Sequence, residues 1–180
     1  MAIEQMLDAS NGSGPQDDGP QIATLAQYIK DLSVESPSAP QVFRWQEQAQ
    51  LNVNFSINIE KADDDVHEVV LKIEVSARSQ SGVHFLVDLS YGGLFGLRNF
   101  PEDALGAFLL AEAPRLLFPF ARQIIADATQ QTGFPPLLLD PIDFGAAYMA
   151  QIEAAQAEQG ENGSNGGGAD AESGGEPAEG

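Results

Sequence analysis

Three stretches of the chain alternate apolar and polar side chains with the period of two that is typical of a half-buried β-strand. Residues 51–60 carry apolar side chains at the odd positions and Asn, Ser or Glu at the even ones. Residues 66–78 and 84–91 repeat the alternation, and the turn-forming stretches KADDD and SQSG separate the three segments. These segments predict consecutive antiparallel hairpins, and Gly92 and Gly93 are expected to interrupt the last strand as a hinge or bulge.

A further strand is expected near the start of the chain, over residues 23–36 (ATLAQYIKDLSVES). Its charges are mixed, as on an edge strand, and its alternation places Ile29 and Asp31 on the same side. A Pro-rich connection, PSAPQVF, follows as an extended loop, with Trp45 just beyond it. We expect the four strands to lie in chain order as a meander.

The spacing of apolar positions becomes helical after the last strand. From Glu102 to Gln131 they form a broad stripe, which Pro114 and Pro119 are expected to break or kink because each proline removes an internal hydrogen bond. Gly133 is expected to end this helix, and Asp143 can cap a last helix through its side chain. The pattern predicts an α+β fold, with a four-stranded antiparallel sheet followed by a long interrupted helix and a C-terminal helix.

The two ends of the chain differ in composition from the middle. Both are rich in small, polar and acidic residues, and both have too few apolar side chains to offset the entropy cost of ordering. We therefore expect a disordered segment over residues 1–20, one folded domain over residues 21–158, and a disordered acidic Gly-rich tail over residues 159–180.

The chain is strongly acidic, with 27 Asp and Glu against 8 Lys and Arg and a formal net charge of −19. Residues 21–150 contain 16 of the acidic residues and all 8 basic ones, so the folded part keeps a net charge of about −8. An acidic domain without a Lys/Arg cluster does not favour nucleic acid or an anionic membrane surface as a partner. A basic protein partner fits instead.

The sequence also bears on the compartment. There is no cysteine, so disulfides and thiolate metal sites are excluded. The start of the chain, MAIEQMLDASNG, does not have the basic and apolar regions of a signal peptide, and no stretch reaches the ~18 uninterrupted apolar residues of a membrane span. We expect a cytoplasmic protein without stable membrane insertion.

Catalytic and cofactor motifs find little support. His67 and His84 fall on predicted strands with no nucleophile in a recognisable turn. The run of residues 63–65, DDD, does not have the Gly and the distant Glu of an EF-hand calcium loop, so a solvated turn is favoured. The pair Gly92 and Gly93 does not form a phosphate-binding GxGxxG motif. We expect no enzyme, no metal and no cofactor.

Large apolar side chains exceed what one sheet and two helices can cover. Trp45 and Phe134 stand in Pro-rich connections, and Tyr148 and Met149 stand in the last predicted helix. Part of this apolar surface should contact other molecules.

Five motifs, in this order, resemble the SecB family of bacterial protein-export chaperones over residues 22–155: KDLSVESPSAPQVF, ADDDVHEVVLKIEVSA, HFLVDLSYGGLF, LLFPFAR and GFPPLLLDPIDFGAAYM. The acidic tail is also similar to that of the family. The resemblance implies a four-stranded antiparallel sheet with two helices and a homotetramer built as a dimer of dimers. It further implies a holdase that binds unfolded secretory preproteins without ATP and passes them to the SecA translocation motor.

The resemblance also assigns roles to residues. It implies a docking site for the basic, zinc-holding C-terminal segment of SecA, in which the zinc belongs to the partner. The residues that match are Asp31, Glu35, Leu86 and Asp88. Asp88 is one methylene shorter than the glutamate that is usual in the family, which reduces its reach.

Two further sets of residues follow from the motifs and the apolar excess. One set is expected to line the groove that binds unfolded clients: Trp45, Phe134, Tyr148 and Met149. Trp45 matches the tryptophan of the family's crossover loop, and a methionine suits a promiscuous site because its side chain adapts easily. The other set is expected at a subunit interface: Phe85, Val87, Leu89 and Tyr91.

Two other functions remain open at this point. The first is a SecB-like chaperone of a toxin–antitoxin system, whose client would be an antitoxin. The second is a small-ligand enzyme or carrier with a closed α+β cavity, which would need convergent polar groups that the sequence does not reveal.

Overall fold

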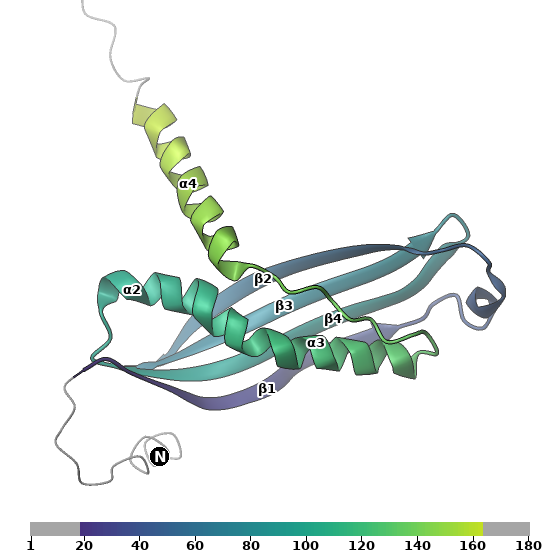
Figure 1. The fold of residues 1–180 in the computed structure, drawn as a ribbon, viewed down its shortest axis with the longest axis horizontal. Coiled ribbons are helices and arrows are strands. Elements are labelled where there is room, and N and C mark those ends of the chain that lie inside the picture. The colour runs from purple at the N-terminus through teal and green to yellow at the C-terminus, as the bar shows by residue number, and fades with distance from the viewer. Residues whose placement is uncertain (1–18, 164–180) are drawn as a thin grey trace, which may run out of the picture.

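The protein is described by a computed structural model over residues 19–163, with side chains as far as Ala157. One antiparallel sheet of four long strands carries a long helix on one face (Figure 1). The strands are β1 (Gln21–Glu35), β2 (Gln50–Asp63), β3 (Val66–Ser79) and β4 (Gly82–Arg98). A 3-10 turn, η1 (Gln41–Arg44), lies in the connection between β1 and β2. The predicted disordered ends fall almost entirely outside the described residues.

The strand order is β1-β4-β3-β2, so the expected meander is wrong for the first strand. β2, β3 and β4 form the predicted hairpins, but β1 pairs with β4 along its length. The connection of residues 36–49 allows this order because three strand spacings amount to only about 14 Å. β1 and β2 are therefore the two edges of the sheet.

β1 does not keep one alternation from end to end. Its register against β4 shifts between Thr24 and Ala26 and again between Ile29 and Asp31. The second bulge leaves Lys30 as the extra residue, so that Ile29 and Asp31 point to opposite faces of the sheet. The sequence-based assignment of these two side chains to the same side is therefore wrong.

The core lies between the long helix and the two central strands. The odd-numbered residues of β3 from Val69 to Ala77 are buried, and so are Phe85, Val87, Leu89 and Tyr91 of β4. These four β4 side chains pack inside the protomer. This corrects the expectation that they contact another subunit themselves.

Gly92 and Gly93 do not interrupt β4, which continues to Arg98. A Cβ atom at Gly92 would lie 2.8 Å from the ring of Tyr28 on β1, and one at Gly93 would lie 2.7 Å from Leu117 of the long helix. The two glycines therefore let a ring approach one face of β4 and the helix approach the other. The expected hinge or bulge is wrong.

The long helix is continuous from Glu102 to Gln131. It consists of α2 (Glu102–Ala107), the π-helical segment η2 (Phe108–Glu112) and α3 (Ala113–Gln131). In η2 the N–H of Ala113 donates to the carbonyl of Phe108, five residues back, and Pro114 follows within the first turn of α3. The predicted irregularity therefore takes the form of a π-turn before Pro114, whereas Pro119 lies inside α3 without interrupting it.

By length and composition alone, this helix could also cross a membrane. In this structure its apolar side packs on β3 and β4. A core helix of a sheet-plus-helix protein passes the same test.

The end of the long helix and the start of the last helix follow the sequence prediction. Gly133 has a φ of +88°, which only glycine adopts easily, and it follows the last turn of α3. Asp143 Oδ1 accepts a hydrogen bond from the N–H of Ala146 at 2.9 Å and so caps α4 (Phe144–Gly163). The crossover between these helices runs along the sheet, and α4 projects away from it (Figure 1). The predicted α+β architecture is confirmed.

Candidate functional site

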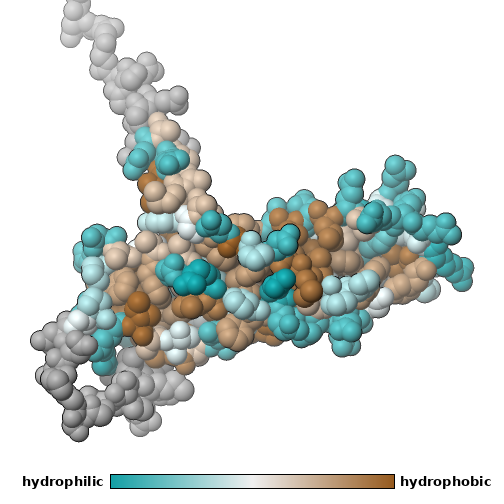
Figure 2. Space-filling model, viewed as in Figure 1, coloured by the Kyte–Doolittle hydropathy of each residue, from teal (hydrophilic) through white to brown (hydrophobic). Residues whose placement is uncertain are grey.

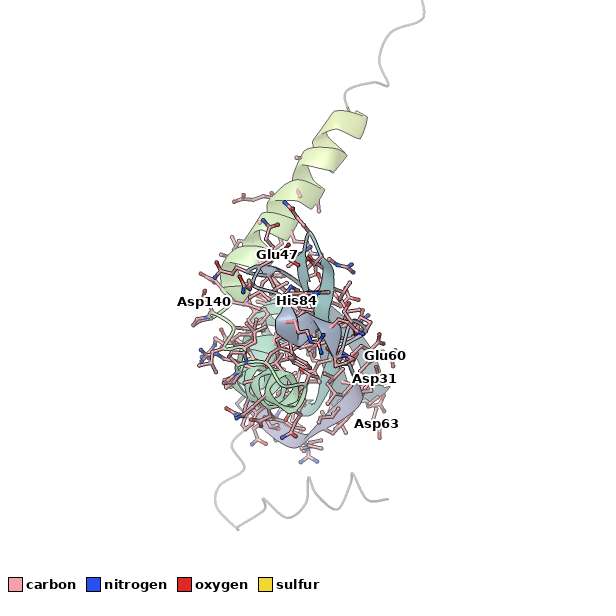
Figure 3. The ribbon with its side chains drawn as sticks, turned by 90° about the vertical axis from the view of Figure 1, so that its right-hand side faces the viewer. Asp31, Glu47, Glu60, Asp63, His84 and Asp140 are labelled. Carbon is pink, nitrogen blue, oxygen red and sulfur yellow. The ribbon has the colours of Figure 1, made fainter. Side chains whose placement is uncertain are left out.

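The sheet face opposite the long helix gathers the four residues of the predicted acidic docking site. Leu86 of β4 lies opposite Glu35 of β1, and Asp31 lies opposite Ser90. Asp88 stands between these two rows on the same face, because side chains two residues apart share a face. In Figure 3 Asp31 and Glu60 lie on the side away from the helix, which is seen nearly end-on. We call this surface the acidic face.

Two shallow depressions cross the acidic face. One, of about 340 Å³, is lined by Glu35, Leu86, Asp88 and Glu74, among others. The other, of about 440 Å³, is lined by Asp31, Lys30, Glu60 and Glu68, among others. Each depression spans all four strands, so the surface could accept an extended or loop segment of a partner.

Lys72 of β3 was not predicted as a site residue, although the alternation of the sequence places it on the polar face. Its Nζ lies 2.9 Å from Oε1 of Glu74 and 3.3 Å from Oδ2 of Asp88. The hydrogen bond to Glu74, followed by the one to Asp88, raises the pKa of Lys72, so the ammonium stays charged. One of the predicted docking carboxylates is therefore already paired in the free protein.

A second polar network ties β1 to β3 across β4. Glu68 is only 8% exposed, and its carboxylate accepts hydrogen bonds from the Tyr28 hydroxyl and from Lys30 Nζ, the latter at 2.7 Å. Hydrogen bonding by Lys30, and then by Tyr28, lowers the pKa of Glu68. Burial, together with the bond to Glu68 and its charge, raises the pKa of Tyr28 to about 12. The network holds the bulge at Lys30, which directly precedes Asp31.

Aromatic side chains gather at the end of the sheet near the crossover. Trp45 meets His84 with ring centroids 5.1 Å apart, and His84 in turn lies 6.1 Å from Phe134. Phe134 also contacts Phe43 and Phe85, at 5.5 and 5.1 Å. Two of the predicted client-groove residues, Trp45 and Phe134, are therefore brought into one cluster.

The other two predicted client-groove residues lie elsewhere. Tyr148 and Met149 belong to α4, with Tyr148 partly buried beside Gly106 of α2 and Met149 exposed. Neither has a ring contact with the Trp45 cluster among the described residues. The structure thus separates the predicted set into two places.

An apolar row on β2 was missed as a candidate for client binding. Leu51, Val53 and Phe55 face the helix side of the sheet, yet they remain 51%, 38% and 40% exposed because α3 covers the central strands instead. Phe55 contacts Phe144, the first residue of α4, with ring centroids 5.6 Å apart. The regular alternation of residues 51–60 indicated this apolar face, but not that it would stay uncovered.

A second uncovered row runs along the other side of the helix. Ile29 and Leu32 of β1 and Leu116 and Phe120 of α3 are all exposed, and Phe120 stacks on Tyr91 with ring centroids 6.4 Å apart. Figure 2 shows apolar surface over the helix side of the molecule. We call this row the β1–α3 row.

The described residues offer no cluster of three His, Cys, Asp or Glu side chains that could hold a metal ion. The described surface offers a carboxylate-rich face on one side of the sheet and two apolar rows on the other, an arrangement that suits complementary surfaces of partners.

A family model described as "Preprotein translocase subunit SecB" matches residues 15–155 of the chain. The chain belongs to the SecB family. Its curated relatives are named "Protein-export protein SecB". One, from Sphingopyxis alaskensis, is 48% identical over 87% of this chain and 92% of its own length. Another, from Rhizorhabdus wittichii, is 54% identical over 79% of this chain and 86% of its own length.

The fold of this SecB-family chain is also found among solved structures. A SecB-like chaperone from Mycobacterium tuberculosis, solved in complex with a peptide from an antitoxin, matches with a TM-score of 0.56 and 18% identity. The match covers 68% of this chain and 90% of that one. At this identity the similarity concerns the fold alone. The SecB chaperone family is not a class of enzymes.

Proposed function

We propose that this chain is an ATP-independent holdase of the cytoplasm, which keeps secretory preproteins unfolded and delivers them to SecA. The observation that carries the proposal is that a SecB-family protomer leaves apolar rows uncovered on one side of its sheet and carboxylates on the other. The chain is 48% and 54% identical to relatives named for protein export, whereas no observation favours an antitoxin as the client.

Unfolded clients would bind on the helix side of the sheet. The row of Leu51, Val53 and Phe55 offers apolar contact that is worth about 25 cal/mol per Å² buried and has no directional requirement. β2 is an edge strand, so its free backbone groups could add hydrogen bonds to an extended client segment. The cluster of Trp45 and Phe134 would extend this surface at one end.

Tyr148 and Met149 would add apolar contacts on the α4 side, where Phe55 meets the start of that helix. Met149 is exposed on a helix that projects from the body of the protomer (Figure 1). A flexible thioether there could adapt to clients of different sequence.

Assembly into a homotetramer, as a dimer of dimers, would use the β1–α3 row. An exposed apolar row of this kind on a long helix and an edge strand is costly for a monomer in water. A partner subunit would cover Leu116 and Phe120, which stand one helical turn apart on α3. Light scattering should give a mass of four chains, and a stable monomer would contradict this part of the proposal.

SecA would dock on the acidic face through its basic, zinc-holding C-terminal segment. Asp31, Glu35 and Asp88 would attract the basic segment and speed its encounter, while Leu86 would supply a small apolar contact. Binding should weaken as salt rises, because exposed charges are screened.

Two experiments test the proposed function. The first mixes the chain with an unfolded preprotein without nucleotide, and we expect aggregation, followed by light scattering, to be suppressed. The second is a pull-down of SecA with Asp31→Lys, which should lose binding. Asp140→Lys makes the same change in charge on the crossover, away from Asp31 in Figure 3, and should keep it. Unchanged aggregation of the preprotein would refute the holdase activity. Equal capture of SecA by both variants would refute docking of SecA on the acidic face.

A further inference from the structure

Lys72 stands in the middle of the acidic face, between the two depressions. On β3 it lies opposite Ser90 of β4. The neighbouring pair on the same face is Glu74 of β3 opposite Asp88 of β4. The first depression includes Glu74 and Asp88, and the second includes Ser90. The ammonium group of Lys72 therefore lies in the path of any basic segment that spans both depressions.

The two oxygens of Asp88 differ in access. Oδ1 is buried and has no hydrogen-bond partner within residues 19–163. Oδ2 lies 3.3 Å from Lys72 Nζ. The oxygen that an incoming cation could reach is therefore already beside an ammonium group of the same chain, so a partner cation must compete with Lys72 for Asp88.

Glu74 gives Lys72 a place to remain. It lies directly opposite Asp88 across the β3–β4 pair, and its Oε1 lies 2.9 Å from Lys72 Nζ. Two carboxylates in this arrangement repel each other, so the free protein needs a cation between them. After Lys72 releases Asp88, its bond to Glu74 can persist, and a cation from the partner can take its place at Oδ2.

We propose that Lys72 is an internal counterion of the acidic face, which occupies Asp88 until a lysine or arginine of the docking partner displaces it. Lys72 thereby lowers the affinity of the acidic face for basic segments and restricts binding to those that offer a cation at Asp88. The inference rests on the proposed function of this face as the SecA-docking surface.

The test measures binding of the basic C-terminal segment of SecA to the full chain by isothermal titration calorimetry at about 0.1 M salt, where charges more than about 10 Å apart are screened. Lys72→Gln should bind about two- to five-fold more tightly than the unchanged chain, the range that one exposed ion pair supplies. Because this variant leaves Glu74 and Asp88 facing each other, the second variant combines Lys72→Gln with Glu74→Gln. It keeps the net charge unchanged and should still bind more tightly.

Lys61→Gln is the matched control for charge. Lys61 of β2 is paired through His67 of β3 with Phe95 of β4. Phe95 is seven residues along β4 from Asp88, so Lys61 lies about 23 Å from Asp88 along the strands. This distance exceeds the screening length of about 10 Å at 0.1 M salt, so the control should bind as the unchanged chain does. An equal gain in Lys61→Gln, or no gain in both Lys72 variants, would overturn the inference.

The outcomes separate the inference from the proposed function. If the unchanged chain binds the segment and Asp31→Lys abolishes binding, but the Lys72 variants bind no more tightly, only the inference fails. If the unchanged chain and all variants fail to bind, the docking surface is wrong and the inference falls with it. Asp88→Asn can also be added to the Lys72 variants. If this change removes their gain in affinity, the result would support displacement of Lys72 at Asp88.

Discussion

Gly92→Ala tests how closely the ring of Tyr28 is held against β4. The added Cβ would lie 2.8 Å from Cε2 and 3.1 Å from Cζ of that ring, which is closer than carbon atoms pack, so the ring must lift. Lifting the ring strains the hydrogen bond from its hydroxyl to the nearly buried Glu68. Overpacking of this kind costs about 1–3 kcal/mol, whereas replacing a strand glycine by alanine gains about 0.5–1 kcal/mol through backbone entropy. We expect a net loss of roughly 0.5–2 kcal/mol in the free energy of unfolding.

The assay is urea denaturation at a fixed protomer concentration, since association with other copies would shift the midpoint. The background variant Tyr28→Ala removes the ring that the new methyl group meets. In that background Gly92→Ala should be neutral or stabilising by up to about 1 kcal/mol, because only the entropic gain remains. The same destabilisation in both backgrounds would show that the clash lies elsewhere and would refute the packing argument.

Three further predictions concern the core, the buried carboxylate and the apolar row of β2. Leu117→Ala should lower the free energy of unfolding by about 2–5 kcal/mol in the same assay, because Leu117 of α3 is fully buried against the sheet. Glu68 has a lowered pKa in the folded protein, so its charge stabilises the fold at pH values above the ordinary pKa of 4.5. This contribution is lost as the pH falls through the lower pKa of the folded state. Thermal melts below pH 5 should therefore show that the difference in melting temperature between the unchanged chain and Glu68→Gln becomes smaller. Val53→Ser should reduce suppression of client aggregation with little change in melting temperature, whereas Asn54→Ser, on the opposite face of β2, should leave both unchanged.

Local patterns in the sequence were sufficient for the elements themselves. The alternation of residues 51–60 and 66–78, the left-handed Gly133 and the capping side chain of Asp143 each act within a few residues along the chain. Strand positions and helix ends could therefore be predicted, and the order of motifs was enough to indicate the SecB family. These features need no knowledge of what lies across the sheet.

The acidic face could be predicted only in part. Motif matching named Asp31, Glu35, Leu86 and Asp88, and the structure places all four on one face. The partner that already holds Asp88, Lys72, comes from β3, and its pairing depends on the register between β3 and β4. Sequence alternation shows which side chains share the polar face, but not which of them stand within reach of each other.

The sequence by itself determined the strands and the helices, because hydrophobic period, turn residues and capping residues are properties of neighbours along the chain, and the resemblance of its ordered motifs indicated the family. The tertiary structure alone decided that β1 joins β4, that a bulge at Lys30 sends Ile29 and Asp31 to opposite faces, and that Phe85 and Leu89 are covered by the chain's own helix while Leu51 and Val53 are not. These outcomes depend on pairing and coverage between segments far apart in the chain, where small differences in register and helix position decide which apolar surface the protomer buries and which it leaves for partners.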